Sequence, residues 1–489
     1  MSSTKNKSSS HQLSLFGFLM ISVSMVISIY AYPTFATSGF AAIFFLIIAG
    51  LLWFIPVCLV SAELGTGGNG WSEAGVFSWG AAAFGDRWGF TMIFLQWMEI
   101  SLGFVSMLYF ISSGLAYAFD ASIIGEPSIV QLVIILAIFW IITFANFFGT
   151  RITKFIATYA FFIGVIFPVA ILIFLGMSYI GEGNKIDITF GLDDFFPDFT
   201  NSASLVVLVS FILSYMGPEA SAVHVNNLKD PGRSYPIAIL ILVLLTVVIA
   251  SCSSLTISMV IPKNDISLSG GIFETFKFLF DYYGVSWAIY PFALIISFST
   301  IGEVSSWCNG PVRGIQKAAK DGILPPFLAE TNEHMMPTRL LWIQGFIVSF
   351  WLIAITLAGM SLGSGNMAFF TAMTITVVVY LAMYILLFLS YIKLKNTVPD
   401  DVNPRKFSLS NRFGMITAIV GLCFTLIAFF ISFTRPDTVS EAVYGDYLTA
   451  LIVCFLAVIL TPHVIYSLTK KHRAQWLENL KQKEIKDNS

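Results

Sequence analysis

The chain has 489 residues, of which 57% are hydrophobic and 11% are charged, and its net charge is −2. Soluble proteins carry roughly a quarter charged residues, so the composition excludes a soluble globular protein. The small net charge gives no basis for a nucleic-acid partner. Apolar runs of about 20 residues recur along the whole length, which is typical of membrane-spanning helices. The sequence therefore predicts an all-α polytopic membrane protein.

Twelve apolar segments are long enough to cross a bilayer, and the basic residues predict their orientation. With both termini inside, only Lys185, Lys263, Lys277 and Arg435 fall outside, which leaves 22 of the 26 basic residues inside. Because cytoplasmic loops are enriched in Lys and Arg, we expect cytoplasmic N- and C-termini in a cell membrane. The expected spans are residues 13–37, 40–62, 88–118, 128–148, 153–178, 201–224, 235–260, 283–312, 339–359, 366–392, 413–434 and 446–468.

Two of these segments carry corresponding interruptions. Tyr30–Pro33 and Tyr215–Pro218 share the spacing Tyr-x-x-Pro, each in the first span of a group of five. A broken helix survives in lipid only where protein or a wet cavity satisfies its backbone. Paired breaks indicate an inverted-repeat transporter with its site at the membrane midplane. We therefore expect the second break, at Met216 and Gly217, to contribute to substrate binding.

Three carboxylates are expected inside the membrane, at Glu99, Glu219 and Glu303. Intramembrane charges are costly and indicate function, and no lysine or arginine is expected at comparable depth. Glu99 and Glu303 are predicted to bind substrate, with Trp307 one turn after Glu303 on the same helix face. Glu219 has two interpretations: a coupling group, or a structural neutral acid bonded to backbone carbonyls.

Other polar and aromatic residues are ambiguous. His224 suits an interfacial histidine better than a proton relay, whereas Tyr380 and Tyr384, one turn apart, suit packing or a lid equally. No nucleotide-binding motif, metal-ligand spacing or nucleophile elbow is present. We therefore expect no catalytic residues, metal or cofactor, and transport driven by gradients.

Four motifs resemble the amino acid–polyamine–organocation superfamily: Pro33–Gly39, Ser61–Gly65, Lys229–Pro236 and Gly310–Pro325. The resemblance implies a LeuT-type fold of five plus five inverted helices, with two extra helices. It also places the first break at Ser24–Ser28, upstream of Pro33, where Ile27, Ser28 and Tyr30 are then expected to bind substrate. The implied parts are residues 1–12 (a cytoplasmic tail), 13–178 (the first repeat), 201–392 (the inverted repeat), 413–468 (helices 11 and 12) and 469–489 (a short basic tail).

Within this superfamily the chain most resembles the glutamate/GABA antiporter family, through Tyr32–Phe40, Phe195–Phe199 and Phe211–Ser221. Members exchange an external amino acid for its internal decarboxylation product, in acid resistance or energy generation. By resemblance, the residues that line or gate the path are Tyr30, Leu213, Glu303, Tyr380 and Tyr384.

Two residues depart from the glutamate/GABA exchanger: Ala31 replaces an acid and Glu99 replaces an amide, and the long C-terminal plug is missing. The expected function is thus exchange of an amino acid for its amine. A cationic pair of the tyrosine/tyramine, histidine/histamine or agmatine/putrescine type fits as well as glutamate/GABA. Proton-coupled amino acid uptake and a non-transporting amino-acid sensor are the alternatives. Expected partners are small amino acids, amines and membrane lipid, and the sequence does not indicate an oligomeric state.

Overall fold

The computed structural model describes a helical membrane protein over residues 14–68, 70–149, 161–222, 225, 228–362, 364–399, 401–437 and 439–487. In these ranges ten helices are long and apolar enough to cross a membrane, and many of their large apolar side chains, such as Phe174 and Phe346, are exposed. The predicted class is confirmed. The tail 1–12, His224 and the start of the span 153–178 lie outside the described residues.

The helices follow the predicted segments closely. The first half of the chain contains α1 (Leu15–Val26), η1 (Ile29–Ala31), α2 (Tyr32–Ala36), α3 (Ala41–Ala49), η2 (Gly50–Phe54), α4 (Ile55–Gly65), α5 (Val76–Phe84), α6 (Asp86–Phe119), α7 (Ser122–Gly125), α8 (Ile129–Asn146), η3 (Phe162–Ile166), α10 (Phe167–Gly181), α11 (Leu192–Phe195), α12 (Ser202–Val206), α13 (Leu208–Leu213) and α14 (Pro218–Ala222). The second half contains α15 (Pro231–Val260), η5 (Lys263–Asp265), α16 (Gly271–Tyr282), η6 (Ser286–Ala288), α17 (Ile289–Trp307), α18 (Gly310–Lys320), η7 (Pro326–Leu328), α19 (Thr338–Leu362), α20 (Gly365–Thr397), α21 (Asn411–Ile431), α22 (Glu441–Thr469), η8 (Lys470–His472) and α23 (Arg473–Asp487).

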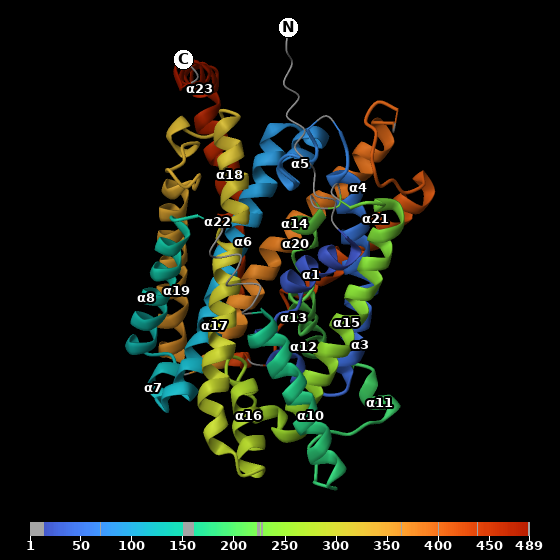
Figure 1. The fold of residues 1–489 in the computed structure, drawn as a ribbon, viewed down its shortest axis with the longest axis vertical. Coiled ribbons are helices and arrows are strands. Elements are labelled where there is room, and N and C mark those ends of the chain that lie inside the picture. Colours follow the sequence, from blue (N-terminus) through green and yellow to red (C-terminus); the bar gives the residue numbers. More distant parts are fainter. Residues whose placement is uncertain are drawn as a thin grey trace.

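The connecting segments sort to the two ends of the molecule. The short helix α5, the helix α18 and the C-terminal helix α23 gather at one end, and α7, α11 and α16 gather at the other (Figure 1). The sequence assigns the loops that contain α5 and α18, and the C-terminal tail, to one side of the membrane, and the loop that contains α11 to the opposite side. The arrangement of these segments agrees with that alternation.

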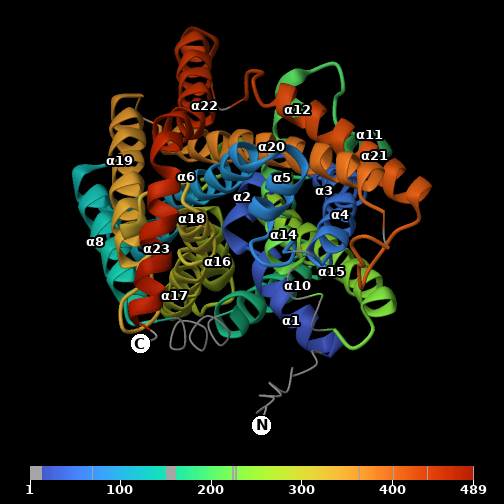
Figure 2. The ribbon, with the colours of Figure 1, turned by 90° about the horizontal axis from the view of Figure 1, so that it is seen from above.

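Two long helices, α6 and α20, form the centre of the protein. They pack along each other, and α6 also contacts α5 and α17. In the most apolar stretch of each, 83% of the residues are buried inside the protein. By contrast, α8 and α19 lie side by side at one edge (Figure 2). Residues on α6 and α20 are therefore positioned to face an internal site rather than lipid.

A buried ion cluster ties α4 and α20 to the loop that follows α20. The Glu63 carboxylate on α4 is fully buried and lies 2.5 Å from both Lys395 Nζ and Arg405 Nη1. The Tyr391 hydroxyl (2.6 Å) and the Leu409 amide (3.2 Å) also donate to it. Removing one member of a buried ion group leaves the others without compensation. The cluster therefore fixes the end of α20 at this side of the protein.

Glu63→Gln is expected to destabilise the protein strongly, because it removes the negative charge that faces two buried cations. The expected loss is about 3–5 kcal/mol, seen as a lower thermal midpoint in detergent. Glu73→Gln is the matched control, since Glu73 is exposed and its ammonium partner Lys317 is 3.8 Å away. Equal midpoints for the two variants would contradict a stabilising role for the cluster.

Candidate functional site: a central cavity between two broken helices

The first break lies at Ile27 and Ser28, within the predicted stretch. Here α1 ends and the backbone becomes extended, with φ/ψ of −84°/107° at Ile27 and −127°/123° at Ser28. The chain then resumes as η1 and α2, and Pro33 lies in the first turn of α2. A proline there removes no helical hydrogen bond, so Pro33 starts the second half-helix and does not cause the break. No side chain caps the N-terminus of η1.

The second break lies between α13 and α14. Gly217 has a φ of +103°, a conformation that side chains with a Cβ rarely adopt, and Pro218 begins α14. The fully buried Tyr215 anchors the unwound stretch, because its hydroxyl donates to the Leu46 carbonyl on α3 at 3.0 Å. The second predicted interruption is therefore also confirmed.

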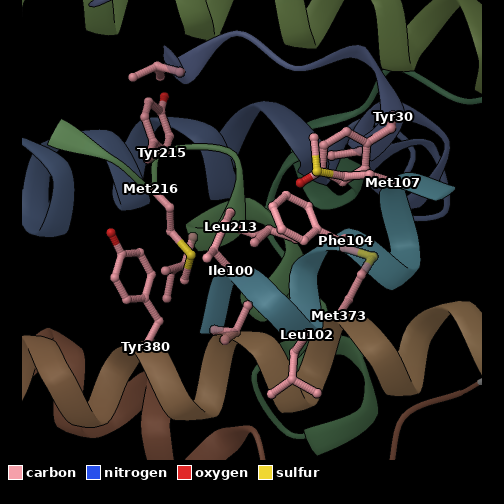
Figure 3. Packing of buried hydrophobic residues seen from close by; sticks show 14 of the residues in the cluster. Tyr30, Ile100, Leu102, Phe104, Met107, Leu213, Tyr215, Met216, Met373 and Tyr380 are labelled. Atoms are coloured by element: carbon pink, nitrogen blue, oxygen red, sulfur yellow. The ribbon is translucent and has the colours of Figure 1, made fainter. Parts of the chain in front are cut away.

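A cavity of about 40 Å³ lies where the two breaks meet α6, α17 and α20. Leu213 and Met216 lie on one side of it with Ile100 and Tyr380, and Tyr30 lies beside Met107 (Figure 3). The lining residues are Val26, Ser28, Tyr30, Glu99, Ile100, Gly103, Met107, Leu213, Met216, Glu303, Trp307, Thr376 and Tyr380. None of these is a lysine, arginine or histidine.

One of the two carboxylates in this cavity, Glu303, is held by the first break. The Ser28 hydroxyl lies 2.9 Å from one carboxylate oxygen and 3.1 Å from the other. Ser28 therefore orients the Glu303 carboxylate and stabilises its charged form. This contact joins the extended residue of the broken helix to α17, 275 residues away in the chain.

The other carboxylate in the cavity, Glu99, has no such support. Its side chain on α6 is buried, with 6% exposed, and no hydrogen-bond donor reaches it among the residues that the structure describes. Gln96 lies three residues earlier on the same helix, but its amide donates to Glu219 at 2.8 Å. The cavity therefore contains one partnered and one unpartnered acid.

Glu219 lies behind the cavity wall and does not line it. Its carboxylate is bonded by the Gln96 amide and by the hydroxyls of Tyr380 and Tyr384, the latter at 2.6 Å. Side-chain donors surround the acid, whereas one of its two interpretations expected backbone carbonyls as partners. The network joins α14 to α6 and α20. It also shows that Tyr380 and Tyr384, whose ring centroids are 4.5 Å apart, do more than pack.

Most predicted residues meet in one place, but four do not line the cavity. Those that line it are Ser28, Tyr30, Glu99, Leu213, Met216, Glu303, Trp307 and Tyr380. Those that do not are Ile27, Gly217, Glu219 and Tyr384. Ile27 and Gly217 shape the two breaks, whereas Glu219 and Tyr384 belong to the hydrogen-bond network behind the wall.

Gln96 and several residues that line the cavity were not predicted from the sequence. Gly103 and Met107 follow Glu99 at four and eight residues, and Thr376 precedes Tyr380 by four. Helical spacing places such residues on one face. The sequence signal for these residues was therefore their spacing of four or eight positions from Glu99 or Tyr380, which were already predicted to line the site.

A larger cavity of about 430 Å³ lies toward the end of the molecule that carries α11. Asp194, Asp198 and Lys263 line it, together with Thr34 from α2 and Phe370 from α20. Hydrogen bonds from the hydroxyl and amide of Thr200 lower the pKa of Asp198. Two aspartates in or next to α11 therefore border a vestibule that reaches α2 and α20.

Three stacked phenylalanine rings lie beside the vestibule. Phe211 on α13 lies between Phe35 on α2 and Phe45 on α3, with ring-centroid distances of 4.5 Å and 5.1 Å. Phe35 and Phe211 belong to the two broken segments, so the stack couples them. Phe45 also lines the vestibule.

This arrangement of two broken helices around an internal polar cavity belongs to a membrane transporter for small molecules. The amino acid permease family model matches residues 13–459. The chain therefore belongs to the amino acid permease family of the amino acid–polyamine–organocation superfamily, as the sequence motifs predicted. Its relatives in this family are transporters and not enzymes.

Several transporters are similar to this chain over nearly its full length. A glutamate/gamma-aminobutyrate antiporter of Lactococcus lactis subsp. lactis is 40% identical over 96% of this chain and 92% of its own length. An uncharacterized transporter of Legionella pneumophila is 30% identical over 95% of this chain and 97% of its own. A probable agmatine/putrescine antiporter of Lactococcus lactis is 23% identical over 86% of this chain and 88% of its own. The similarity to glutamate/GABA antiporters predicted from the motifs is confirmed.

Ser28→Ala is expected to raise the KM for substrate about tenfold or more, because a hydrogen bond to a charged group contributes about 1.5–3 kcal/mol. Transport kinetics in proteoliposomes measure the change. Ser22→Ala is the matched control: Ser22 is a buried serine on α1, six residues before Ser28, and its hydroxyl has no hydrogen-bond partner. A similar KM for the two variants would show that Ser28 does not support Glu303.

Tyr380→Phe and Tyr384→Phe are expected to separate two roles within one network. Each variant loses a donor to the buried Glu219, so both should lose about 1–3 kcal/mol of stability and show a lower thermal midpoint. Only Tyr380 lines the cavity, so only Tyr380→Phe should also raise KM. Equal effects of the two variants on KM would contradict this assignment.

Proposed function

We propose that the protein is an antiporter that exchanges an external amino acid for the internal amine formed by its decarboxylation. The observation that carries the proposal is the central cavity, which is lined by two carboxylates and, within the described residues, by no fixed cation. Such a site suits a ligand that brings its own positive charge. The glutamate/gamma-aminobutyrate and agmatine/putrescine antiporters among the relatives support exchange of this kind.

The proposed architecture is a LeuT-type inverted repeat in a cell membrane, with twelve spans and both termini cytoplasmic. Residues 13–178 and 201–392 form the two repeats, and 413–468 add two helices. The two breaks, at the starts of the repeats, support this assignment. Alternating access then moves the broken segments against the other helices around a fixed site.

The proposed binding mode assigns opposite ends of the substrate to different groups. The amino group bonds Glu303, and a substrate carboxylate, where present, meets the backbone N–H groups freed at the breaks. Tyr30 and Trp307 pack against the side chain. A cavity of about 40 Å³ is too small for an amino acid, so lining side chains such as Leu213 and Tyr380 must move as the site fills. This requirement supports their gating role.

Strict exchange follows if the carboxylates of Glu99 and Glu303 have no cation beside them in the empty carrier. A carrier without cargo would have to reorient with these carboxylates in its centre and no cation beside them, at a cost of several kcal/mol. A bound amino group removes that cost. The empty carrier therefore reorients slowly, and the loaded carrier reorients fast. Because both cavity acids need a cation, a cationic amine fits this site better than an anionic amino acid does.

Counterflow in proteoliposomes tests the proposal. Internal amine should accelerate the uptake of the labelled external amino acid at least tenfold over empty liposomes, since both half-reactions use a loaded carrier. Amine and amino acid are varied in matched pairs, glutamate with GABA included. Uptake that needs a proton gradient and no internal amine would indicate a proton-coupled uptake permease. Binding without accumulation would indicate a sensor.

A further inference from the structure

We infer that Glu99 binds a second positive charge of the substrate, so that the exchanged amine is a dication: a diamine or a guanidino amine derived from a basic amino acid. This inference rests on the proposed antiport and names its substrate class. It comes from the one acid in the cavity that has no partner in the described part of the chain.

The donors around the buried acids are distributed unevenly. Glu63 faces two cations, a hydroxyl and an amide, and Glu219 is bonded by two tyrosines and Gln96. Glu303 has the Ser28 hydroxyl. Glu99 is buried, with 6% exposed, whereas Glu303 is half-buried, yet no described side chain or amide donates to Glu99. Glu99 lines the cavity, so a ligand in the cavity can supply the donor that it lacks.

Two side chains near Glu99 that could donate to it bond Glu219 instead. Gln96, one turn earlier on α6, donates to Glu219, and so does Tyr380, which lines the same cavity. The other lining groups near Glu99 on α6 are Ile100, Gly103 and Met107, which offer no side-chain donor. The helix that carries Glu99 thus presents an acid on an otherwise apolar face.

The charge count then selects the ligand. One ammonium group that bonds Glu303 leaves Glu99 without a partner, whereas a second cationic group at the other end of the ligand serves both acids. A basic amino acid also brings two cations, and its carboxylate can meet the N–H groups at the breaks. Both members of such a pair satisfy the two acids, so both half-reactions carry the same neutralised site.

Homologous exchange of single compounds tests this assignment. Proteoliposomes are loaded with labelled 1,4-diaminobutane, tyramine or 4-aminobutanoate, and the same unlabelled compound is added outside. The wild-type protein should exchange the diamine at least tenfold faster than tyramine or 4-aminobutanoate. Glu99→Gln should lower diamine exchange tenfold or more and leave the exchange of the single-amine compounds unchanged or faster, because they no longer face an uncompensated acid.

The control is Glu126→Gln, which removes an exposed carboxylate outside this cavity and should leave all three rates unchanged. If Glu99→Gln does not fold, Glu99→Asp keeps the charge and should shift the KM of the diamine alone. Wild-type exchange of tyramine or 4-aminobutanoate as fast as the diamine would overturn the inference while antiport stands. No stimulation of any flux by a compound on the opposite side would overturn both.

Discussion

The structure depends on the constraint that backbone polar groups inside a membrane must find partners. Ten helices in the described ranges meet it internally, whereas the segments around Ser28 and Gly217 give up helical bonds in the middle of the protein. Those two departures are possible because α6, α17 and α20 surround them. The site therefore lies where backbone groups lose their helical hydrogen bonds. Those backbone groups are available to a ligand for that reason.

The buried carboxylates show how one residue type serves different purposes according to its donors. Glu63, with two cations, holds helices together, and Glu219, with three side-chain donors, links α14 to α6 and α20. Glu303 and Glu99 have few donors or none and face the cavity. Glu99 is nearly as buried as Glu63 and Glu219, so burial alone does not separate a cavity acid from a structural acid. The number of committed donors does, and it decreases from the supporting structure to the site.

Much of this could be predicted from the sequence, because helix length, the two interruptions and the intramembrane acids are local signals. The break at Ile27–Ser28 is within the predicted stretch, although no glycine marks it. What the sequence could not supply were partners from distant segments: the Ser28–Glu303 bond spans 275 residues, and Glu63 meets Lys395 across 332. Glu219 was ambiguous for this reason, since its donors lie on other helices.

The helix α20 touches every one of these places. It carries Thr376 and Tyr380 at the cavity, Tyr384 beside Glu219 and Lys395 at the Glu63 cluster. These four residues span about 28 Å at 1.5 Å per residue. Because one continuous helix carries all of these contacts, a displacement of its middle by cargo would be transmitted to the loop that follows its end. Occupancy of the cavity and the position of that distant loop would then be coupled through α20.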